Sequence, residues 1–161
     1  WAYNDQQDTE SLGGAAKHYG LMSSSQLCAL PIESIAADDA ILFLWVTSPL
    51  LEESFDVIKA WGFQYKSSFV WDKVRHNMGH YNSVRHEFLL VATRGSCTPD
   101  ERKLFDSVQS IERSNKHSEK PEEFREIIDT LYPPRGNADR IELFRRGGAP
   151  ENWQVWGDQA A

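Results

Sequence analysis

The chain has no run of about 18 apolar residues, the length that a helix needs to cross a membrane. It also has no charged and apolar leader ending in small residues, so no signal peptide is expected. We therefore expect a soluble protein without a membrane partner.

Cysteine is scarce, with Cys28 and Cys97 as the only two residues of this type. They have no paired spacing and no second cluster of metal-binding residues, so we predict no metal site. Two isolated cysteines are typical of a protein in a reducing compartment.

Positive charge is in deficit, because 17 Lys and Arg residues stand against 24 Asp and Glu residues and give a net charge of −7. Non-specific affinity for nucleic acid comes largely from Lys and Arg contacts with phosphate. A surface that binds phosphate all over is therefore excluded, and any nucleic-acid site must be local.

Several catalytic motifs are missing from the sequence. It contains no G-x-G-x-x-G fingerprint, no P-loop, no G-x-S-x-G elbow and no H-E-x-x-H, and the pair His86 and Glu87 is adjacent rather than at zinc-binding spacing. These absences argue against a zinc enzyme and against a serine hydrolase.

The size of the chain suits one compact domain. Its 161 residues, 40% of them hydrophobic, suffice to bury roughly two-thirds of the unfolded surface. We predict a single domain over residues 1–161. Because the sequence begins at Trp1, without a methionine and inside an aromatic-rich segment, we expect this domain to be truncated at its N-terminus.

Apolar patterning predicts alternating strands and helices. The continuously apolar run Ala40–Val46 predicts a strand buried on both faces. Thr47 or Ser48 can cap a helix after it, whose apolar residues recur at helical spacing as far as Gly62. A second long helix, with acidic residues in its first turn, is predicted from Lys120 to the residues before Pro133. A short helix is predicted at 24–29, where Ser23, Ser24 and Ser25 offer N-caps. Further strands are predicted at 63–74, 87–93, 107–111, 140–144 and 153–156.

This order favours an α/β sheet, in which ligands usually lie beyond the carboxyl ends of the strands. Asp158 directly follows the last predicted strand, where nucleotide-binding α/β folds place an acid that binds ribose hydroxyls. The alternative is a surface aspartate in a turn.

Basic and aromatic residues alternate between positions 71 and 86. In an acidic protein this mixture suits phosphate contacts together with base stacking. The alternative is a solvated hairpin whose charges keep the protein soluble. The candidate nucleic-acid residues are Lys73, Arg75, His76 and Arg85, interleaved with Trp71 and Tyr81.

Five strings occur in the order found in one enzyme family, and together they extend over nearly the whole chain. In these strings the sequence resembles the MT-A70 adenine methyltransferases. The strings are His18-Tyr19-Gly20; Phe43-Leu-Trp-Val46; His86-Glu87-x-Leu-Leu with Thr93-Arg94-Gly95; Lys120-Pro-Glu-Glu-Phe124 with Leu131-Tyr-Pro-Pro134; and Arg140-Ile-Glu-Leu-Phe-Arg-Arg146 with Trp153-x-x-Trp-Gly157.

The resemblance implies a Rossmann-like methyltransferase fold with permuted motif order, in which the catalytic D-P-P-W comes first and the cofactor strand late. It implies methyl transfer from S-adenosyl-L-methionine to the N6 amine of adenine, in DNA more than in RNA. Trp1 stands at the last position of D-P-P-W, so we expect these 161 residues alone to be inactive. Short forms like this one are typical of bacterial or phage members, which implies a cytoplasmic protein.

Three residues are implied at the methyl acceptor. Trp1 would form a stacking wall for the base, Tyr19 would lie over the target base or the cofactor entrance, and Glu87 would bind the base edge. Each has a structural alternative: Trp1 as a plug in a groove, Tyr19 as a loop anchor, and Glu87 as an ion-pair partner of Arg85.

The resemblance also implies a set of cofactor residues. Lys120 would meet the methionine carboxylate with support from Ser118, and a nearby helix N-terminus would add a favourable dipole. Glu142 would end the strand beneath the methionine part of the cofactor. Asp158 stands where many relatives have Asn, and Ala149 replaces a polar residue of some relatives. The residues implied at the ribose are Arg146, Asp158 and Gln159.

An alternative from a different class remains open. A non-catalytic family member could keep the fold as a binding partner or nucleic-acid scaffold, and a homodimer or a heterodimer is compatible with either reading. An intact D-P-P before Trp1 would favour the enzyme, and a degenerate one the scaffold.

The basic segment yields a first prediction. Replacing Lys73, Arg75 and Arg85 together should flatten the salt dependence of nucleic-acid binding by about 0.9 per lost contact on a duplex, and should leave cofactor binding unchanged. Binding measured over a series of salt concentrations checks this. An unaltered slope would assign the segment to a solvated loop.

Overall fold

The computed structural model describes residues 21–76, 81–114, 119–135 and 140–160. The chain divides into two compact units: the first extends to Thr98 and includes Leu104–Pro121, and the second comprises Pro99–Lys103 and the residues from Glu122 onward. The expected single domain stays a prediction. None of the helices in the described residues is long and apolar enough to cross a membrane.

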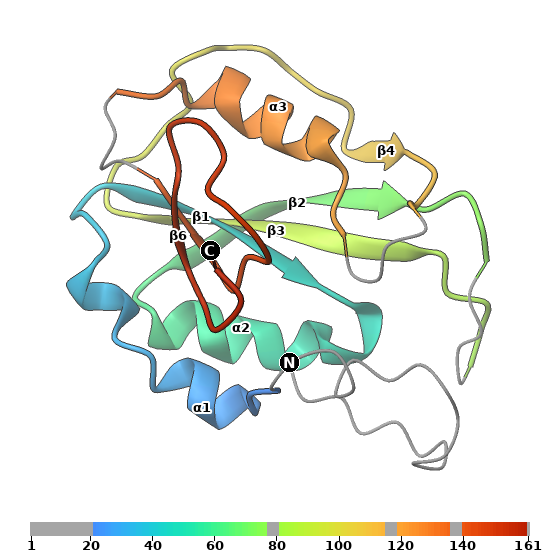
Figure 1. Cartoon of the computed structure of the whole chain (residues 1–161), viewed down its shortest axis with the longest axis horizontal. Coiled ribbons are helices and arrows are strands. Elements are labelled where there is room, and N and C mark those ends of the chain that lie inside the picture. The colour runs from blue at the N-terminus through green and yellow to red at the C-terminus, as the bar shows by residue number, and fades with distance from the viewer. Residues whose placement is uncertain (1–20, 77–80, 115–118, 136–139, 161) are drawn as a thin grey trace. The chain divides into compact units, whose positions relative to one another are not determined.

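The first unit contains a four-stranded mixed sheet (Figure 1). The third strand pairs antiparallel with the first and the second, so these two run parallel to each other on either side of it, and the short fourth strand runs parallel to the second. This arrangement confirms the α/β class, and the permuted motif order stays a prediction. The strands are β1 (Ala40–Val46), β2 (Gln64–Asp72), β3 (His86–Arg94) and β4 (Val108–Ser110), in the spatial order β1-β3-β2-β4.

Strand β1, the helix that follows it and strand β2 form the predicted unit of strand, helix and strand. Helix α2 (Leu51–Ala60) follows a 3₁₀ turn, Ser48–Leu50, that holds Pro49 in its first turn. The expected hydroxyl cap is wrong, because Thr47 makes no side-chain cap bond. The 3₁₀ turn places Leu50, which has no polar side chain, in front of α2.

The burial of the strands differs from what the sequence predicts. Among the described strands β1 lies at an end of the sheet, and only Val46 of its residues is fully buried. The prediction that this strand is buried on both faces is therefore wrong, because its other six residues are only half-buried. Strand β3 lies between β1 and β2 and contributes more buried residues than any other strand, among them Leu89, Leu90 and Ala92.

Helix α1 (Ser24–Cys28) lies beside α2 (Figure 1). The predicted serine cap is confirmed: the hydroxyl of Ser23 accepts the backbone N–H of Gln26 at 3.2 Å, and the Gln26 side chain accepts the Ser23 N–H at 2.8 Å. Trp61, after α2, donates its indole N–H to the carbonyl of Leu27 at 2.7 Å. This buried bond ties the two helices together.

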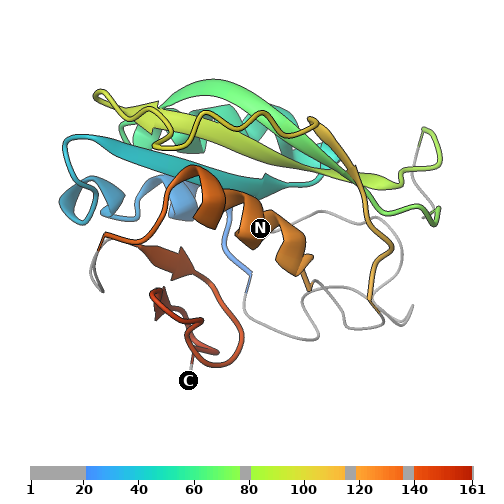
Figure 2. The ribbon, with the colours of Figure 1, turned by 90° about the horizontal axis from the view of Figure 1, so that it is seen from above.

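The second unit contains helix α3 (Glu122–Leu131) and two short parallel strands, β5 (Ile141–Leu143) and β6 (Gln154–Trp156). Figure 2 shows α3 in orange and the two strands, which follow it in the chain, in red. The helix begins two residues after Lys120, with two glutamates in its first turn. The predicted helix and strands are thus confirmed, with shorter bounds. The buried residues of α3 are Phe124, Ile127 and Leu131.

The turn after β3 yields a second prediction. Gly95 has φ +60°, and an added Cβ would meet the side chain of Asp39 and the backbone carbonyl of Asp38. Gly95→Ala should lower the free energy of unfolding by at least about 1–2 kcal/mol, the cost of the left-handed conformation alone. The control is Gly148→Ala, which meets nothing within 4 Å. Urea denaturation giving equal losses for both variants would contradict this account.

Candidate active site

Glu87 lies at the start of β3, buried to 7% exposure. Lys73 donates from Nζ to Glu87 Oε1 at 2.5 Å, and Lys120 donates from Nζ to Oε2. Each oxygen of one carboxylate thus faces its own ammonium group. Two cations share a single buried anion.

Two tryptophans adjoin this cluster on the same face of the sheet. Trp71 is the register partner of Glu87, and Trp45 is the partner of Leu89, two residues further along β3. The two rings meet edge to face with centroids 6.1 Å apart. The indole N–H of Trp71 donates to the carbonyl of Ile111 at 2.7 Å, which fixes the orientation of that ring.

Both ammonium groups also lie over these rings. Lys73 Nζ is 5.0 Å from the centroid of Trp71, and Lys120 Nζ is 5.3 Å from that of Trp45 and 5.9 Å from that of Trp71. Attraction between a cation and the face of an aromatic ring grows as water is excluded. The rings therefore help to hold two like charges at one half-buried site.

A tight turn after β2 positions Lys73. Its backbone N–H donates to the carbonyl of Arg85 at 2.8 Å, and Asp72 accepts the N–H of Val74 at 3.0 Å. Val74 has φ +64°, a conformation that β-branched residues rarely adopt. Backbone strain of this kind persists only where surrounding contacts enforce it.

Asp72 binds Arg85, which the sequence analysis considered as a partner of Glu87. Arg85 Nε lies 3.0 Å from Asp72 Oδ1, and Nη2 donates to Oδ2 at 3.1 Å. The N–H of Val74, and then Ser110 and Arg85, lower the pKa of Asp72 below its ordinary value. The alternative that Arg85 pairs with Glu87 is wrong, because two lysines take both oxygens of Glu87.

The four predicted nucleic-acid residues differ in exposure. The side chains of Arg75 and Arg85 are 66% and 47% exposed, and that of Lys73 is 12% exposed. Arg75 pairs with Glu112, and His76 shares a hydrogen bond of 3.0 Å with Ser83. The nucleic-acid role stays a prediction, and we expect the two arginines rather than Lys73 to contribute most of the salt dependence.

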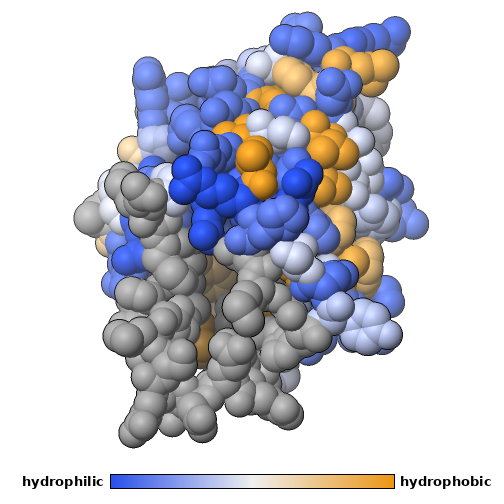
Figure 3. Space-filling view, turned by 90° about the vertical axis from the view of Figure 1, so that its right-hand side faces the viewer, coloured by the Kyte–Doolittle hydropathy of each residue, from blue (hydrophilic) through white to orange (hydrophobic). Residues whose placement is uncertain are grey.

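On the face shown in Figure 3, hydrophilic residues predominate and hydrophobic residues form small groups between them. Tyr81, in the basic segment, is fully exposed. An exposed aromatic ring in a basic segment is compatible with the stacking role that the sequence predicts.

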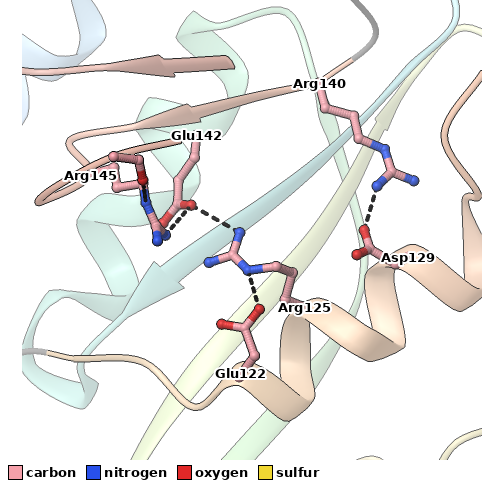
Figure 4. A network of polar contacts seen from close by, with 7 residues as sticks. Glu122, Arg125, Asp129, Arg140, Glu142 and Arg145 are labelled. Atoms are coloured by element: carbon pink, nitrogen blue, oxygen red, sulfur yellow. Dashed lines mark hydrogen bonds and ion pairs between the residues drawn. The ribbon is translucent and has the colours of Figure 1, made fainter. Parts of the chain in front are cut away.

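In the second unit, Glu142 on β5 accepts hydrogen bonds from two arginines (Figure 4). Its Oε2 atom lies 3.0 Å from Arg125 Nη1 and 2.8 Å from Arg145 Nη1. Arg125 also donates to Glu122 at 2.7 Å, so the network ties the first turn of α3 to β5. The expected role of Glu142 beneath the cofactor stays a prediction.

The residues predicted at the ribose follow β5 and β6. Gly147, next to Arg146, donates its backbone N–H to the carbonyl of Gln159 at 2.9 Å. Gly157 approaches Phe144 so closely that an added Cβ would lie 3.0 Å from the Phe144 Cα atom. The structure thus brings the turn of Asp158 and Gln159 beside the turn of Arg146, and Asp158 is exposed.

Three predicted site residues, Trp1, Tyr19 and Ser118, lie outside the described residues. The sequence patterns did not indicate that Trp45 lies beside the Glu87 cluster or that Lys73 pairs with Glu87. The only sequence signal was the position of Trp45 and Trp71 near the ends of predicted strands. In the part of the chain that the structure describes, no three His, Cys, Asp or Glu side chains gather as a metal site would need.

The ionisation of Glu87 yields a third prediction. Burial alone would raise its pKa, but Lys120 and Lys73 outweigh burial and lower the pKa below the ordinary 4.5. A folded-state pKa below the unfolded value stabilises the fold above about pH 4.5, and this contribution is lost as the pH falls through the folded pKa. Glu87→Gln should therefore cost about 3 kcal/mol near pH 7 and progressively less below pH 4.5.

Urea unfolding of both proteins between pH 3 and pH 7 checks this prediction. Glu112→Gln serves as the control, because the pair of Glu112 with Arg75 is exposed and should contribute less than about 1 kcal/mol. A Glu87→Gln penalty that does not change with pH would contradict the ionised state of Glu87.

Comparison with known proteins identifies the family. Residues 3–159 match the sequence model of the family described as MT-A70. The chain is 37% identical over 148 residues to the Type II methyltransferase M.MunI of Mycoplasma sp., with 91% of this chain and 61% of that protein covered.

Two further relatives are the N(6)-adenosine-methyltransferase MT-A70-like protein of Drosophila melanogaster, 32% identical, and the human N(6)-adenosine-methyltransferase catalytic subunit METTL3, 28% identical. In both comparisons 88% of this chain is covered, together with 24% of the Drosophila protein and 25% of the human protein. The chain thus spans less than two-thirds of the length of these relatives. As the five strings predict, the chain belongs to the MT-A70 family.

Proposed function

We propose that this chain forms part of an enzyme that transfers a methyl group from S-adenosylmethionine to the N6 amine of adenine in nucleic acid. The observation that most supports this function is the buried Glu87 carboxylate between two lysines, in a chain whose family implies S-adenosylmethionine as methyl donor. The cofactor supplies an electrophilic sulfonium methyl group when bound.

The charge of the Glu87 cluster fits the carboxylate of the methionine part of the cofactor. Two ammonium groups share one carboxylate, so the cluster can accept a further negative charge. The side chain of Lys120 is 32% exposed, against 12% for Lys73. Lys120 is therefore the ammonium group that a ligand can reach with less rearrangement.

Glu87 suits the methyl acceptor as a hydrogen-bond acceptor. The adenine amine is a poor nucleophile because its lone pair is delocalised into the ring. Carboxylate and carbonyl oxygens that accept its hydrogens localise this lone pair and stabilise the positive charge that develops. The lysines keep Glu87 ionised despite its burial, which preserves its capacity to accept.

DNA is the acceptor that we propose, with RNA as the alternative that the assay below separates. The chain is more similar to the Type II methyltransferase, at 37% identity, than to the two N(6)-adenosine-methyltransferases. The relative from Mycoplasma also supports our expectation of a bacterial, cytoplasmic protein. Dimerisation stays a prediction.

A fourth prediction concerns cofactor affinity. In the full-length protein, Lys120→Ala and Asp158→Ala should each weaken binding of S-adenosylmethionine by about 1.5–3 kcal/mol, or about 10- to 150-fold, because each removes a charged hydrogen-bonding group. Calorimetry measures the affinity. Lys66→Ala is the control, because Lys66 is an exposed lysine on β2 that bonds only to Gln64 among the contacts described. A variant with unchanged affinity would not belong to the site.

A fifth prediction concerns the chemistry. Glu87→Gln in the full-length protein should lower the rate of methyl transfer by about 100- to 1000-fold, as the loss of one preorganised electrostatic group does in other enzymes. The assay uses labelled cofactor with adenine-containing DNA and RNA oligonucleotides. Glu126→Gln, an exposed substitution on α3, is the control and should retain the wild-type rate.

The same assay separates the enzyme from the scaffold. Transfer to DNA but not RNA supports the proposal in full, and transfer to RNA alone would correct the acceptor. A wild-type protein that binds cofactor and nucleic acid without transferring a methyl group would instead be a non-catalytic member of the family.

A further inference from the structure

The Glu87 cluster contains one cation more than its carboxylate needs. Nearby charged groups have other partners: Arg85 binds Asp72, and Glu119 accepts the hydroxyl of Ser114 at 2.6 Å. His86, whose side chain alternates to the opposite face of β3, packs its ring against Phe88. Within the described residues, Lys73 and Lys120 are therefore the cations that neutralise Glu87.

The two lysines are held differently. Lys73 directly follows β2, its backbone bonds to Arg85, and its side chain is 12% exposed over the ring of Trp71. Lys120 lies before α3, outside any helix or strand, and its side chain is 32% exposed. Lys73 is thus fixed in the cluster, and Lys120 is the partner that can turn to a ligand.

The different exposure of the two lysines becomes important when a ligand binds Lys120 and draws it away from Glu87. A buried carboxylate without a cation favours its protonated form. A protonated Glu87 would present an O–H donor on one oxygen and lose part of its capacity to accept hydrogen bonds. The cluster needs a cation that stays when Lys120 turns away.

We propose that Lys73 is a positioning residue that keeps Glu87 an ionised acceptor while Lys120 binds the carboxylate of the cofactor. This inference rests on the proposed function. Lys73 acts through Glu87 and touches neither substrate nor cofactor. It gives Lys73 a role that differs from the phosphate contact predicted from sequence, and it replaces the expectation that loss of Lys73 leaves cofactor binding unchanged.

Proton uptake on cofactor binding tests the proposal. Calorimetry of the full-length protein with S-adenosylmethionine at pH 6, in buffers of different ionisation enthalpy, gives the number of protons taken up. We expect almost no uptake by the wild type, and uptake approaching about one proton by Lys73→Met, because burial favours the protonated carboxyl once both cations are gone. The affinity of this variant should also weaken as the pH rises.

Matched variants isolate the charge. Lys73→Arg keeps a cation and should behave as the wild type, as should Lys66→Met, which removes an exposed lysine of β2. Lys73→Gln is a second neutral variant that keeps a hydrogen-bond donor beside Glu87, so that the test survives if the methionine variant unfolds. In methyl transfer, the acid limb of the kcat profile should move up by about 1–3 pH units in the neutral variants and return in Lys73→Arg.

The outcomes distinguish this inference from the proposed function. A wild-type protein that does not bind S-adenosylmethionine overturns the proposed function, and this inference with it. Wild-type binding together with folded neutral variants that take up no proton overturns the inference alone. A neutral variant that changes only the salt dependence of nucleic-acid binding would also overturn it, and would return Lys73 to a phosphate contact.

Discussion

An ionised carboxylate is costly to bury unless cations and hydrogen-bond donors surround it. Glu87 meets this requirement with one lysine on each oxygen. The constraint links three parts of the first unit, because β3 supplies the acid, the end of β2 supplies Lys73, and the segment before α3 supplies Lys120. The strained turn at Val74 and the anchored ring of Trp71 belong to the same arrangement.

The same arrangement suits transfer chemistry. A cluster in which two cations share one anion can release one cation to a ligand and still keep the anion ionised. That property connects the burial of Glu87 with both halves of the proposed reaction, in which Lys120 would bind the cofactor's carboxylate while Glu87 would accept hydrogen bonds from the adenine amine. The arginine network around Glu142 lies within the second unit, where charge-assisted hydrogen bonds connect α3 to β5.

Local sequence patterns predicted the helices and strands, but they did not predict which side chains pair across long stretches of the chain. The apolar run at 40–46, the serine cap at Ser23 and the acidic first turn of α3 are local signals, and the structure confirms each element. The partners of Glu87 lie 14 and 33 residues away in sequence, so strand register and chain path decide them. From the sequence we considered Arg85, two residues away, as the ion-pair partner of Glu87, but in the structure Arg85 pairs with Asp72.

The central claim is that Glu87 is a buried carboxylate kept ionised by Lys73 and Lys120. Carbon-13 NMR of the glutamate carboxyl groups, titrated from pH 2 to pH 8 and assigned by the signal missing in Glu87→Gln, measures its pKa directly. We expect a pKa below the ordinary 4.5, since two lysines outweigh burial. A pKa above that value would mean that burial dominates, and it would contradict the account.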